Sequence, residues 1–448
     1  MSRFSQLPLI RSLPRVATAP FCPSEVQGSV PVPEGIPFWR KVLIFSGPGL
    51  LVSVGYMDPG NWATDIAAGS QFGFNLLFVV ALSSLCAIVL QCLSMRLGMA
   101  GGLDLAQASR KHYSRPVNLT LWVLAELAII ATDVAEVLGC ALAFHLLLGV
   151  SLKTGIGITA LDTILILGLK GKGFRTIEAI ILAFVATIGI CYIVELWMVK
   201  PPWGSVAHGL IPDLTRLSSP NAWYLAMGIL GATVMPHNLY LHSSVSQTRR
   251  FRPGPEGKKE AIRLGTIDTV VSLSLAFLIN GAILVLAATA FHNTGQTQVA
   301  EIDEAYRLLE PIVGTGLASI LFGIALLAAG QSSTFTGTIA GQVIMEGFLN
   351  LKIPCWIRRV ITRGLALIPA FVGVSILGDG STGKLLVLSQ VILSLQLPFA
   401  VFPLIRFTSD PRIMGQFRNP LWLKLLAYFL FAAIVCANLI MVRALLTG

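Results

Sequence analysis

Charged residues are scarce in this chain of 448 residues. Asp, Glu, Lys and Arg make up 12% of it, hydrophobic residues make up 54%, and the mean hydropathy is +0.77. A soluble globular domain carries about twice that share of charge, because its surface must be solvated. The composition therefore excludes an ordinary soluble protein and indicates an integral membrane protein.

Several catalytic and metal-binding motifs are also absent. The seven cysteines include no C-x-x-C pair, and the chain holds neither an H-E-x-x-H motif nor a nucleophile elbow. These absences argue against a zinc cluster, a metalloprotease and a nucleophilic hydrolase. We expect reduced, packed thiols, no bound cofactor and no enzymatic activity.

Long hydrophobic runs are what the sequence has instead. A membrane-spanning helix needs about 20 predominantly apolar residues, and eleven segments meet this need, which predicts an all-α membrane protein. The segments are 42–72, 75–98, 117–148, 153–169, 176–198, 222–247, 262–290, 313–345, 361–378, 384–405 and 421–444.

The distribution of positive charge predicts the orientation of the chain. Most of the 32 Lys and Arg fall in the N-terminal segment and in alternate loops, and cytoplasmic loops retain positive charge. We expect a flexible cytoplasmic tail at 1–38, an external C-terminus and a cell membrane location, the bacterial inner membrane. Loop topology also accounts for the net charge of +10, so no nucleic-acid partner is expected, and no obligate protein partner is evident.

Two four-residue patterns interrupt the first and sixth spans. Asp58-Pro59-Gly60-Asn61 and Met235-Pro236-His237-Asn238 both read X-Pro-X-Asn. Proline removes a backbone donor and clashes with the preceding turn, so each helix should break there. Unpaired backbone groups at membrane depth are tolerated where they line a binding site.

The spacing of the two breaks predicts the organisation of residues 39–448. They lie five spans apart, and because five is odd, a second copy of a five-span unit enters the membrane from the opposite face. We expect an inverted repeat with substrate held between the two discontinuous helices. Its parts are repeat one at about 42–198, repeat two at about 222–405 and an extra helix at about 421–444.

The side chains at the breaks suggest the substrate. One carboxylate, two carboxamides, one imidazole and one thioether form a plausible site for a partly dehydrated divalent metal ion. Sulfur is a poor ligand for Ca²⁺ and Mg²⁺ but a tolerable one for Mn²⁺, Fe²⁺, Co²⁺ and Cd²⁺. Met235 is therefore the expected selectivity residue, with core packing as the alternative. Gln390, a carboxamide in the tenth span, is a further candidate ligand, with ordinary interhelical hydrogen bonding as the alternative.

Three acids in the third span suggest a proton path. Glu126, Asp133 and Glu136 project within about 80° of one helix face. They can pass a proton from the metal site toward the cytoplasm, or form ion pairs with arginines such as Arg358, Arg359 or Arg363, and the two interpretations are compatible. Metal arrival at Asp58 should expel a proton. His237 titrates near neutral pH and is a candidate to tune that step, or else packs against a free carbonyl.

Three motifs in order resemble the Nramp family of proton-coupled divalent metal transporters. They are GYMDPGNWATD from Gly55, GATVMPHNLYLHSS from Gly231 and GQSSTFTGTIAGQVIMEGFL from Gly330. The resemblance runs from about residue 40 to the C-terminus. It implies a LeuT-like inverted repeat of five plus five helices, with discontinuous helices 1 and 6 and an eleventh helix added.

The resemblance also implies a ligand set and a function. Asp58 and Asn61 would supply oxygen, Met235 sulfur, and the backbone near Gly55 and Ala232 carbonyl oxygens. The family also points to Asp133 and Glu136 as proton carriers. The expected function is import of Mn²⁺, and of Fe²⁺, Co²⁺ or Cd²⁺, with protons.

Four other functions are alternatives to proton-coupled import of transition metal ions. A branch of the same family transports Mg²⁺ but lacks the methionine of the second break. A sodium-coupled amino-acid transporter on the same fold would need neither Asp58 nor Met235. A channel and a membrane-embedded metal-dependent enzyme are further alternatives, of which the first would carry current far above the metal flux.

Overall fold

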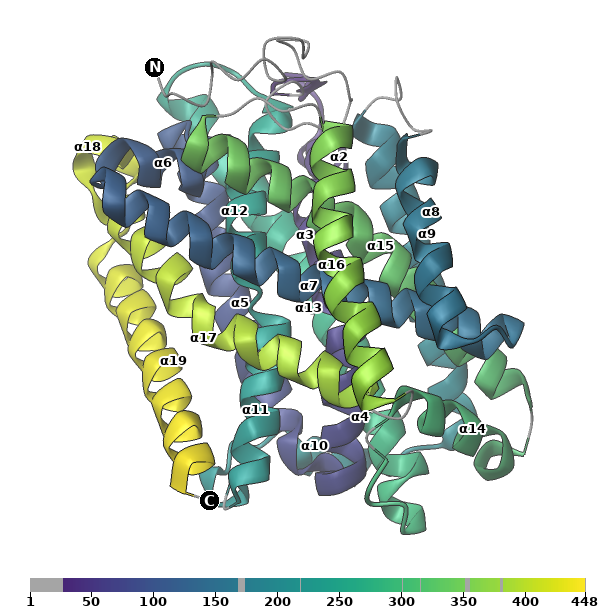
Figure 1. The fold of residues 1–448 in the computed structure, drawn as a ribbon. Coiled ribbons are helices and arrows are strands. Elements are labelled where there is room, and N and C mark those ends of the chain that lie inside the picture. The colour runs from purple at the N-terminus through teal and green to yellow at the C-terminus, as the bar shows by residue number, and fades with distance from the viewer. Residues whose placement is uncertain are drawn as a thin grey trace.

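The computed structural model describes residues 27–167, 174–217, 219–299, 301–314, 316–350, 355–378 and 382–447, and they form a bundle of helices. Two two-residue strands, β1 (Val30–Pro31) and β2 (Arg249–Arg250), pair in parallel. The longer helices run between the two ends of the molecule (Figure 1). The α-helices of the first half of the chain, short ones included, are α2 (Phe38–Phe45), α3 (Pro48–Ser53), α4 (Pro59–Phe72), α5 (Leu77–Arg96), α6 (Leu105–His112), α7 (Arg115–Leu148), α8 (Leu152–Leu167), α9 (Phe174–Val199) and α10 (Trp203–Gly209). Those of the second half are α11 (Pro220–Thr233), α12 (Pro236–Val245), α13 (Pro255–Ala290), α14 (Ile302–Val313), α15 (Gly316–Leu349), α16 (Cys355–Leu377), α17 (Thr382–Ser409), α18 (Pro411–Met414) and α19 (Leu421–Thr447).

As far as the structure describes them, the eleven segments expected to span a membrane each coincide with a helix or with a broken helix. Within the described residues, seven helices are long and apolar enough to cross a membrane. The first and sixth segments are interrupted, as the prolines predicted. Of the segment 313–345, Val313 ends α14 and residues 316–345 lie in one continuous helix, α15.

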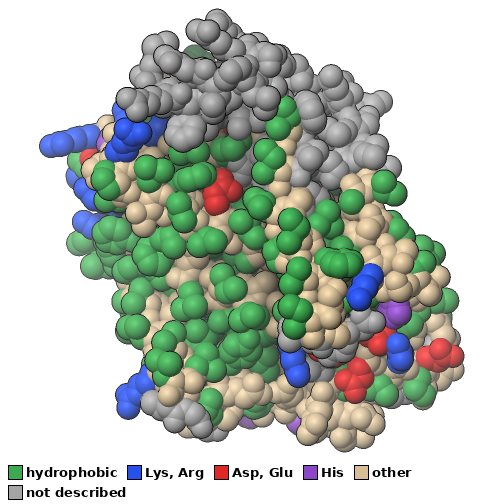
Figure 2. Space-filling view, in the orientation of Figure 1, with side chains coloured by type: hydrophobic (Ala, Val, Ile, Leu, Met, Phe, Trp, Pro, Cys, Tyr) green, Lys and Arg blue, Asp and Glu red, His purple; other side chains and the backbone are tan. Residues whose placement is uncertain are grey.

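The surface agrees with a lipid-facing protein. Figure 2 shows a broad band of hydrophobic side chains across the middle of one face, with basic side chains gathered toward the ends. Large apolar residues of α17 and α19, such as Phe399, Phe402 and Phe429, are more than 40% exposed. Their exposure is favourable in lipid and would be costly in water.

The N-terminal segment was expected to lack structure. Its described part begins at Gln27, and residues 1–26 lie outside the described residues. Gly28 N donates to the Gln247 carbonyl at 3.0 Å, and Val32 N donates to that of Arg250 at 2.9 Å. This stretch is therefore attached to the segment that follows α12.

Candidate metal site

Both proline breaks have the same local geometry. Pro59 and Pro236 are the first residues of α4 and α12, and the residue before each, Asp58 or Met235, is the N-cap in an extended conformation. Proline suits the first helical position because its missing N–H would have no partner there. Each break thus ends one half-helix and starts another in the interior of the bundle.

The breaks also leave two carbonyl groups without their usual helical donors. In an α-helix the carbonyl of residue i accepts from the N–H of residue i+4. The i+4 residue of Gly55 is Pro59 and that of Ala232 is Pro236, and proline has no N–H. Gly55 and Ala232 lie in the last turns of the half-helices that precede the breaks, and the carbonyl end of a helix favours positive charge.

Asp58 and Asn61 are positioned by backbone contacts. Asp58 Oδ1 accepts from the Asn61 N–H at 2.9 Å, and Asn61 Nδ2 donates to the Tyr56 carbonyl at 2.7 Å. The other oxygens, Asp58 Oδ2 and Asn61 Oδ1, have no hydrogen-bond partner although both side chains are buried. One free carboxylate oxygen and one free amide oxygen therefore remain at the first break.

Met235 occupies the equivalent place at the second break. Its side chain is fully buried and packs with Ala128 and Ala131 of α7 and Leu393 of α17. Asn238 Nδ2 approaches the Met235 sulfur at 3.6 Å, while Asn238 Oδ1 has no partner. Met235 thus packs in the core, as the alternative interpretation expected, and its thioether also has a polar neighbour, the Asn238 side chain.

Glycines bring the two breaks close together. A Cβ at Gly55 would lie 2.3 Å from Asn238 Nδ2, and a Cβ at Gly60 would lie 1.8 Å from Gln390 Nε2. A Cβ at Gly231 would lie 1.9 Å from the Gln390 carbonyl oxygen. Gln390 therefore contacts both broken helices, and its Oε1 has no hydrogen-bond partner.

The close approach at Gly231 yields a first prediction. Gly231→Ala should reduce metal uptake strongly and destabilise the protein by about 1–3 kcal/mol, because the new Cβ meets the backbone of α17, which cannot yield. Gly228→Ala, one turn earlier on α11, is the control, since its Cβ would meet a Thr64 side-chain methyl at 3.0 Å. Uptake by reconstituted protein and thermal unfolding measure the effect, and equal behaviour of the two variants would contradict it.

A hydrogen-bonded chain that sequence reasoning did not identify lies beside the site. The Tyr56 carbonyl accepts from Asn280 Nδ2 of α13 at 2.7 Å, and the Tyr56 hydroxyl accepts from Gln91 Nε2 at 2.7 Å. Gln91 Oε1 in turn lies 3.0 Å from His242 Nδ1. Asn280 carried one available signal, because a carboxamide in an apolar span must find a polar partner.

The candidate proton carriers are dispersed over α7 and α12. His237 is buried, and its Nδ1 lies 3.3 Å from the Thr132 hydroxyl of α7. Ser333 Oγ donates to Glu136 Oε1 at 3.1 Å, and a Cβ at Gly337 would lie 2.7 Å from the same oxygen.

The three acids of α7 differ in burial. A Cβ at Gly337 would also lie 3.4 Å from Asp133 Oδ1, so Asp133 and Glu136 both face α15. Glu126 is only half-buried and accepts from Trp122 Nε1 at 3.0 Å, so the three acids do not share one buried surface. The side chains of Arg358, Arg359 and Arg363, the expected ion-pair partners, lie outside the described residues.

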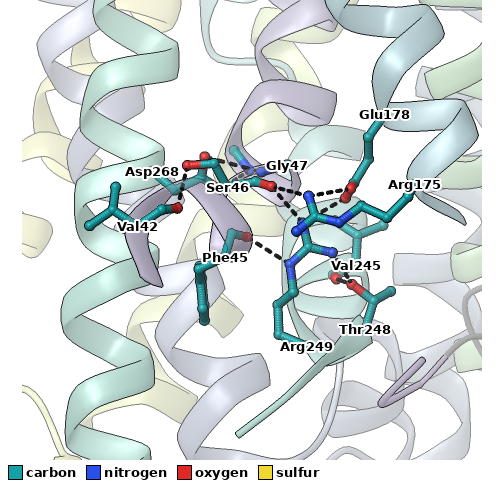
Figure 3. Close-up of polar contacts among 11 residues, drawn as sticks. Val42, Phe45, Ser46, Gly47, Arg175, Glu178, Val245, Thr248, Arg249 and Asp268 are labelled. Carbon is teal, nitrogen blue, oxygen red and sulfur yellow. Dashed lines mark hydrogen bonds and ion pairs between the residues drawn. The ribbon is translucent and has the colours of Figure 1, made fainter. Parts of the chain in front are cut away.

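A buried ionic network lies at the end of α2 (Figure 3). Arg249 Nε donates to the Phe45 carbonyl at 2.7 Å and Nη2 to the Ser46 carbonyl at 2.9 Å, at the end of α2. The same Nη2 lies 2.8 Å from Glu178 Oε1 of α9. A guanidinium at a helix C-terminus satisfies carbonyls that have no helical donor.

Three further residues, Asp268, Gly47 and Gly49, extend this network. Asp268 of α13 accepts from the N–H groups of Gly47 at 3.3 Å and Gly49 at 2.7 Å. Gly47 has φ 146°, and a Cβ there would lie 2.3 Å from Glu178 Oε1, so only glycine fits. The network joins α2 and α3 to α9, α13 and β2, and sequence reasoning missed it because its members are far apart in the chain.

The candidate ligands are enclosed. The side chains of Asp58, Asn61, Met235 and Gln390 are each at most 1% exposed. In the described part of the chain, no group of three or more His, Cys, Asp or Glu side chains is arranged to hold a metal. Any metal site at the breaks therefore combines a single carboxylate with neutral ligands.

Comparisons with known proteins agree with this architecture. The divalent metal cation transporter MntH of Ralstonia nicotianae is 63% identical over 437 residues, which are 98% of this chain and 99% of the relative. The crystal structure of the Eremococcus coleocola manganese transporter superposes with a TM-score of 0.86 at 40% identity, covering 93% of this chain and 90% of that one. A nucleobase-cation-symport-1 family transporter in a closed conformation has a TM-score of 0.59 at 17% identity, covers 97% of this chain and 95% of that one, and supports the fold alone.

These matches confirm the predicted fold class, a LeuT-like helical membrane protein. The relatives named above are transporters and not enzymes, as the sequence predicted. The family model described as natural resistance-associated macrophage protein-like matches residues 49–444. On this evidence the chain belongs to the Nramp family.

Proposed function

We propose that this protein moves divalent transition metal ions, Mn²⁺ and also Fe²⁺, Co²⁺ or Cd²⁺, into the cytoplasm by alternating access coupled to protons. The observation that carries the proposal is the pair of N-caps. Asp58 supplies a carboxylate and Met235 a thioether at the two half-helix starts, and Gln390 contacts α4 beyond the first break and α11 before the second. Related proteins whose names specify divalent metal or manganese transport support the same substrate class.

The ligand set supports selectivity for softer dications. Asp58, Asn61 and Gln390, with the carbonyls of Gly55 and Ala232, offer oxygen to any divalent cation. A thioether adds affinity for transition metals while contributing little to Ca²⁺ or Mg²⁺. The buried location removes water from the ion, so the identity of each ligand counts more than it would at a surface.

Proton coupling follows from the chemistry of a buried carboxyl. Asp58 binds metal as a carboxylate and is less costly at membrane depth when it carries a proton, so metal and proton compete for it. His237, Asp133, Glu136 and, nearer the surface, Glu126 supply acceptors toward the end that holds α2. With the positive loops at that end, this end is the cytoplasmic one and the end of α19 faces outward.

The test is uptake into sealed liposomes, and Met235→Ala is the decisive variant. We expect it to retain Mn²⁺ uptake but to lower the discrimination against Ca²⁺ at least about tenfold, equivalent to about 1.4 kcal/mol. Met227→Ala is the matched control, because Met227 is also buried, in α11, but lies away from the break. Unchanged Ca²⁺ discrimination in Met235→Ala would remove the basis for sulfur ligation, and uptake that requires Na⁺ would favour the sodium-coupled alternative.

A further inference from the structure

A basic cavity of about 420 Å³ lies where α17, α18 and α19 meet, away from the proline breaks. Three cations line it: Arg406 in the last turn of α17, Arg412 in α18 and Lys424 near the start of α19. All three side chains are exposed. Figure 1 places α18 at the same end of the molecule as α2, so the basic cavity opens at that end of the bundle.

The positive charge of the basic cavity is not neutralised by the protein. In the part of the chain that the structure describes, none of the three cations forms an ion pair. The Arg406 guanidinium lies over the Tyr113 ring at 5.1 Å, which orients the side chain and leaves its charge in place. Asp410 also lines the cavity, but its Oδ1 caps α18 by accepting from the Arg412 N–H at 2.8 Å. Three cations therefore stand against one carboxylate, and the cavity favours an anion.

Two hydroxyl groups add hydrogen-bonding capacity to the basic cavity. Ser409 Oγ accepts from Asn419 Nδ2 at 3.4 Å, and its own O–H is available to donate into the cavity. Tyr428 of α19 is half-buried and lines the same cavity. Guanidinium, ammonium and hydroxyl groups together are suited to the several acceptor oxygens of a phosphate group.

An apolar stripe leads from the basic cavity toward the middle of the bundle. Its members on α17 are three or four residues apart and so share one face of the helix. They are Leu395, Phe399 and Phe402, each at least 40% exposed, followed by Arg406. The rings of Phe402 and Phe431 lie 5.8 Å apart, so α19 runs beside this face, and Phe429 of α19 is 68% exposed. A cation thus ends a row of exposed apolar side chains.

The length of α17 places the basic cavity at the depth of phospholipid headgroups. Gln390, which contacts both broken helices, precedes Arg406 by 16 residues, or about 24 Å of helix. Because α17 is inclined in Figure 1, its rise across the membrane is smaller than that length. The hydrocarbon core ends about 15 Å from the bilayer centre, and the headgroups end at about 20–22 Å. With the breaks near the bilayer centre, Arg406 reaches the headgroup layer.

The outer surface has the same arrangement. Figure 2 shows basic side chains beside hydrophobic ones on the part of the face where Figure 1 draws α18 and the start of α19. A phosphate near the cations and a hydrocarbon chain on the apolar side chains would each meet a matching surface. Free phosphate would make only the first of these contacts.

We propose that the basic cavity binds the phosphate of an anionic phospholipid whose acyl chains lie along the apolar stripe of α17 and α19. Lipid tails are as apolar as leucine, so the stripe contributes packing, and the cations select the anionic headgroup. The lipid belongs to the leaflet at the end that holds α2, which the orientation proposed above makes cytoplasmic. Binding itself requires the cavity and not that orientation.

The test measures lipid binding to the purified protein in detergent, by native mass spectrometry and by the rise in unfolding temperature. We expect phosphatidylglycerol to bind at least about tenfold tighter than phosphatidylcholine. Replacing all three cations, Arg406→Gln, Arg412→Gln and Lys424→Gln, should lower the affinity for phosphatidylglycerol at least about tenfold. Each cation near an anionic lipid surface contributes about fivefold. The affinity for phosphatidylcholine should change less than about twofold, because its headgroup has no net charge.

The control is a second triple variant, Lys111→Gln, Arg115→Gln and Lys259→Gln. It removes the same charge from exposed cations of α6, α7 and α13 at the same end of the molecule and should keep the affinity for phosphatidylglycerol. Equal losses in the two triple variants would show a general attraction to a positive surface and would overturn the proposal. Equal affinities of the unaltered protein for the two lipids would overturn it too.

Two further measurements keep the result interpretable. Inorganic phosphate and glycerol phosphate are added in place of lipid, and stabilisation as strong as that by phosphatidylglycerol would mean that the cavity takes free phosphate and no lipid. The replaced side chains are exposed, so unfolding without lipid should be unchanged. If the triple variant is less stable, Lys424→Gln alone decides, with an expected loss of about fivefold. Because lipid binding is the readout, failure of the proposed metal transport would leave this result intact.

Discussion

Replacing Asp58 with Asn should abolish metal transport while leaving the fold intact. Asn is as good an N-cap as Asp, so the bond from the Asn61 N–H to position 58 can be kept. The substitution removes the negative charge, and Asp58 is the only residue of the two X-Pro-X-Asn patterns that carries a carboxylate. We expect metal affinity to fall at least about 100-fold, or about 2.8 kcal/mol, measured by Mn²⁺ binding and by uptake into liposomes.

Comparison of two variants separates the two roles of Asp58. Asp58→Ala removes the cap and the charge together, and it should lower thermal stability by about 1 kcal/mol in addition to abolishing uptake. Asp58→Asn should unfold like the unaltered protein. Uptake above half the normal rate in Asp58→Asn would mean that the charge is not needed and that the breaks hold something other than a dication.

Arg249→Ala should open the end of the bundle that holds α2. Arg249 donates to the carbonyls of Phe45 and Ser46 and pairs with Glu178. Removing one partner of a buried ion pair costs about 3–5 kcal/mol. Arg175, 3.1 Å from Glu178 Oε2, offsets part of that cost. In a conformation in which α2 has already moved away from Arg249, the substitution removes no such contact. Arg249→Ala should therefore shift the population toward that conformation.

Cysteine labelling can measure this opening. The side chain of Ser53 in α3 is fully buried, so the reagent should label Ser53→Cys slowly in the parent protein and at least about tenfold faster with Arg249→Ala. Metal uptake should fall, because a transporter that stays open on one side does not complete its cycle. Arg250→Ala is the matched control, since Arg250 is the next residue and is exposed. Equal labelling of the two variants would show that the network does not hold the end closed.

Some features of the fold were accessible from local sequence because their causes are local. A run of about 20 apolar residues spans a bilayer wherever it occurs, and all eleven such runs coincide with helices. Proline breaks a helix through its own ring and its missing N–H, so both interruptions were predicted at Asp58-Pro59 and Met235-Pro236. The roles of Asp58, Asn61 and Met235 as ligands stay predictions.

Other features depended on residues far apart in the chain. The spacing on α7 predicted a common face for Glu126, Asp133 and Glu136. In the packed structure Glu126 is half-buried, whereas Asp133 and Glu136 face Gly337 of α15. Gln390 was expected as a candidate ligand, whereas its close approach to both Gly60 and Gly231 emerged from packing.

The chain by itself determined that this is a membrane protein of broken and unbroken helices, because hydropathy and proline act through neighbouring residues. Only the tertiary structure decided which polar groups meet. Arg249 with Glu178, Tyr56 with Asn280, and Trp62 with Tyr192 come together because helices pack by shape, and no pattern along one helix encodes its partner.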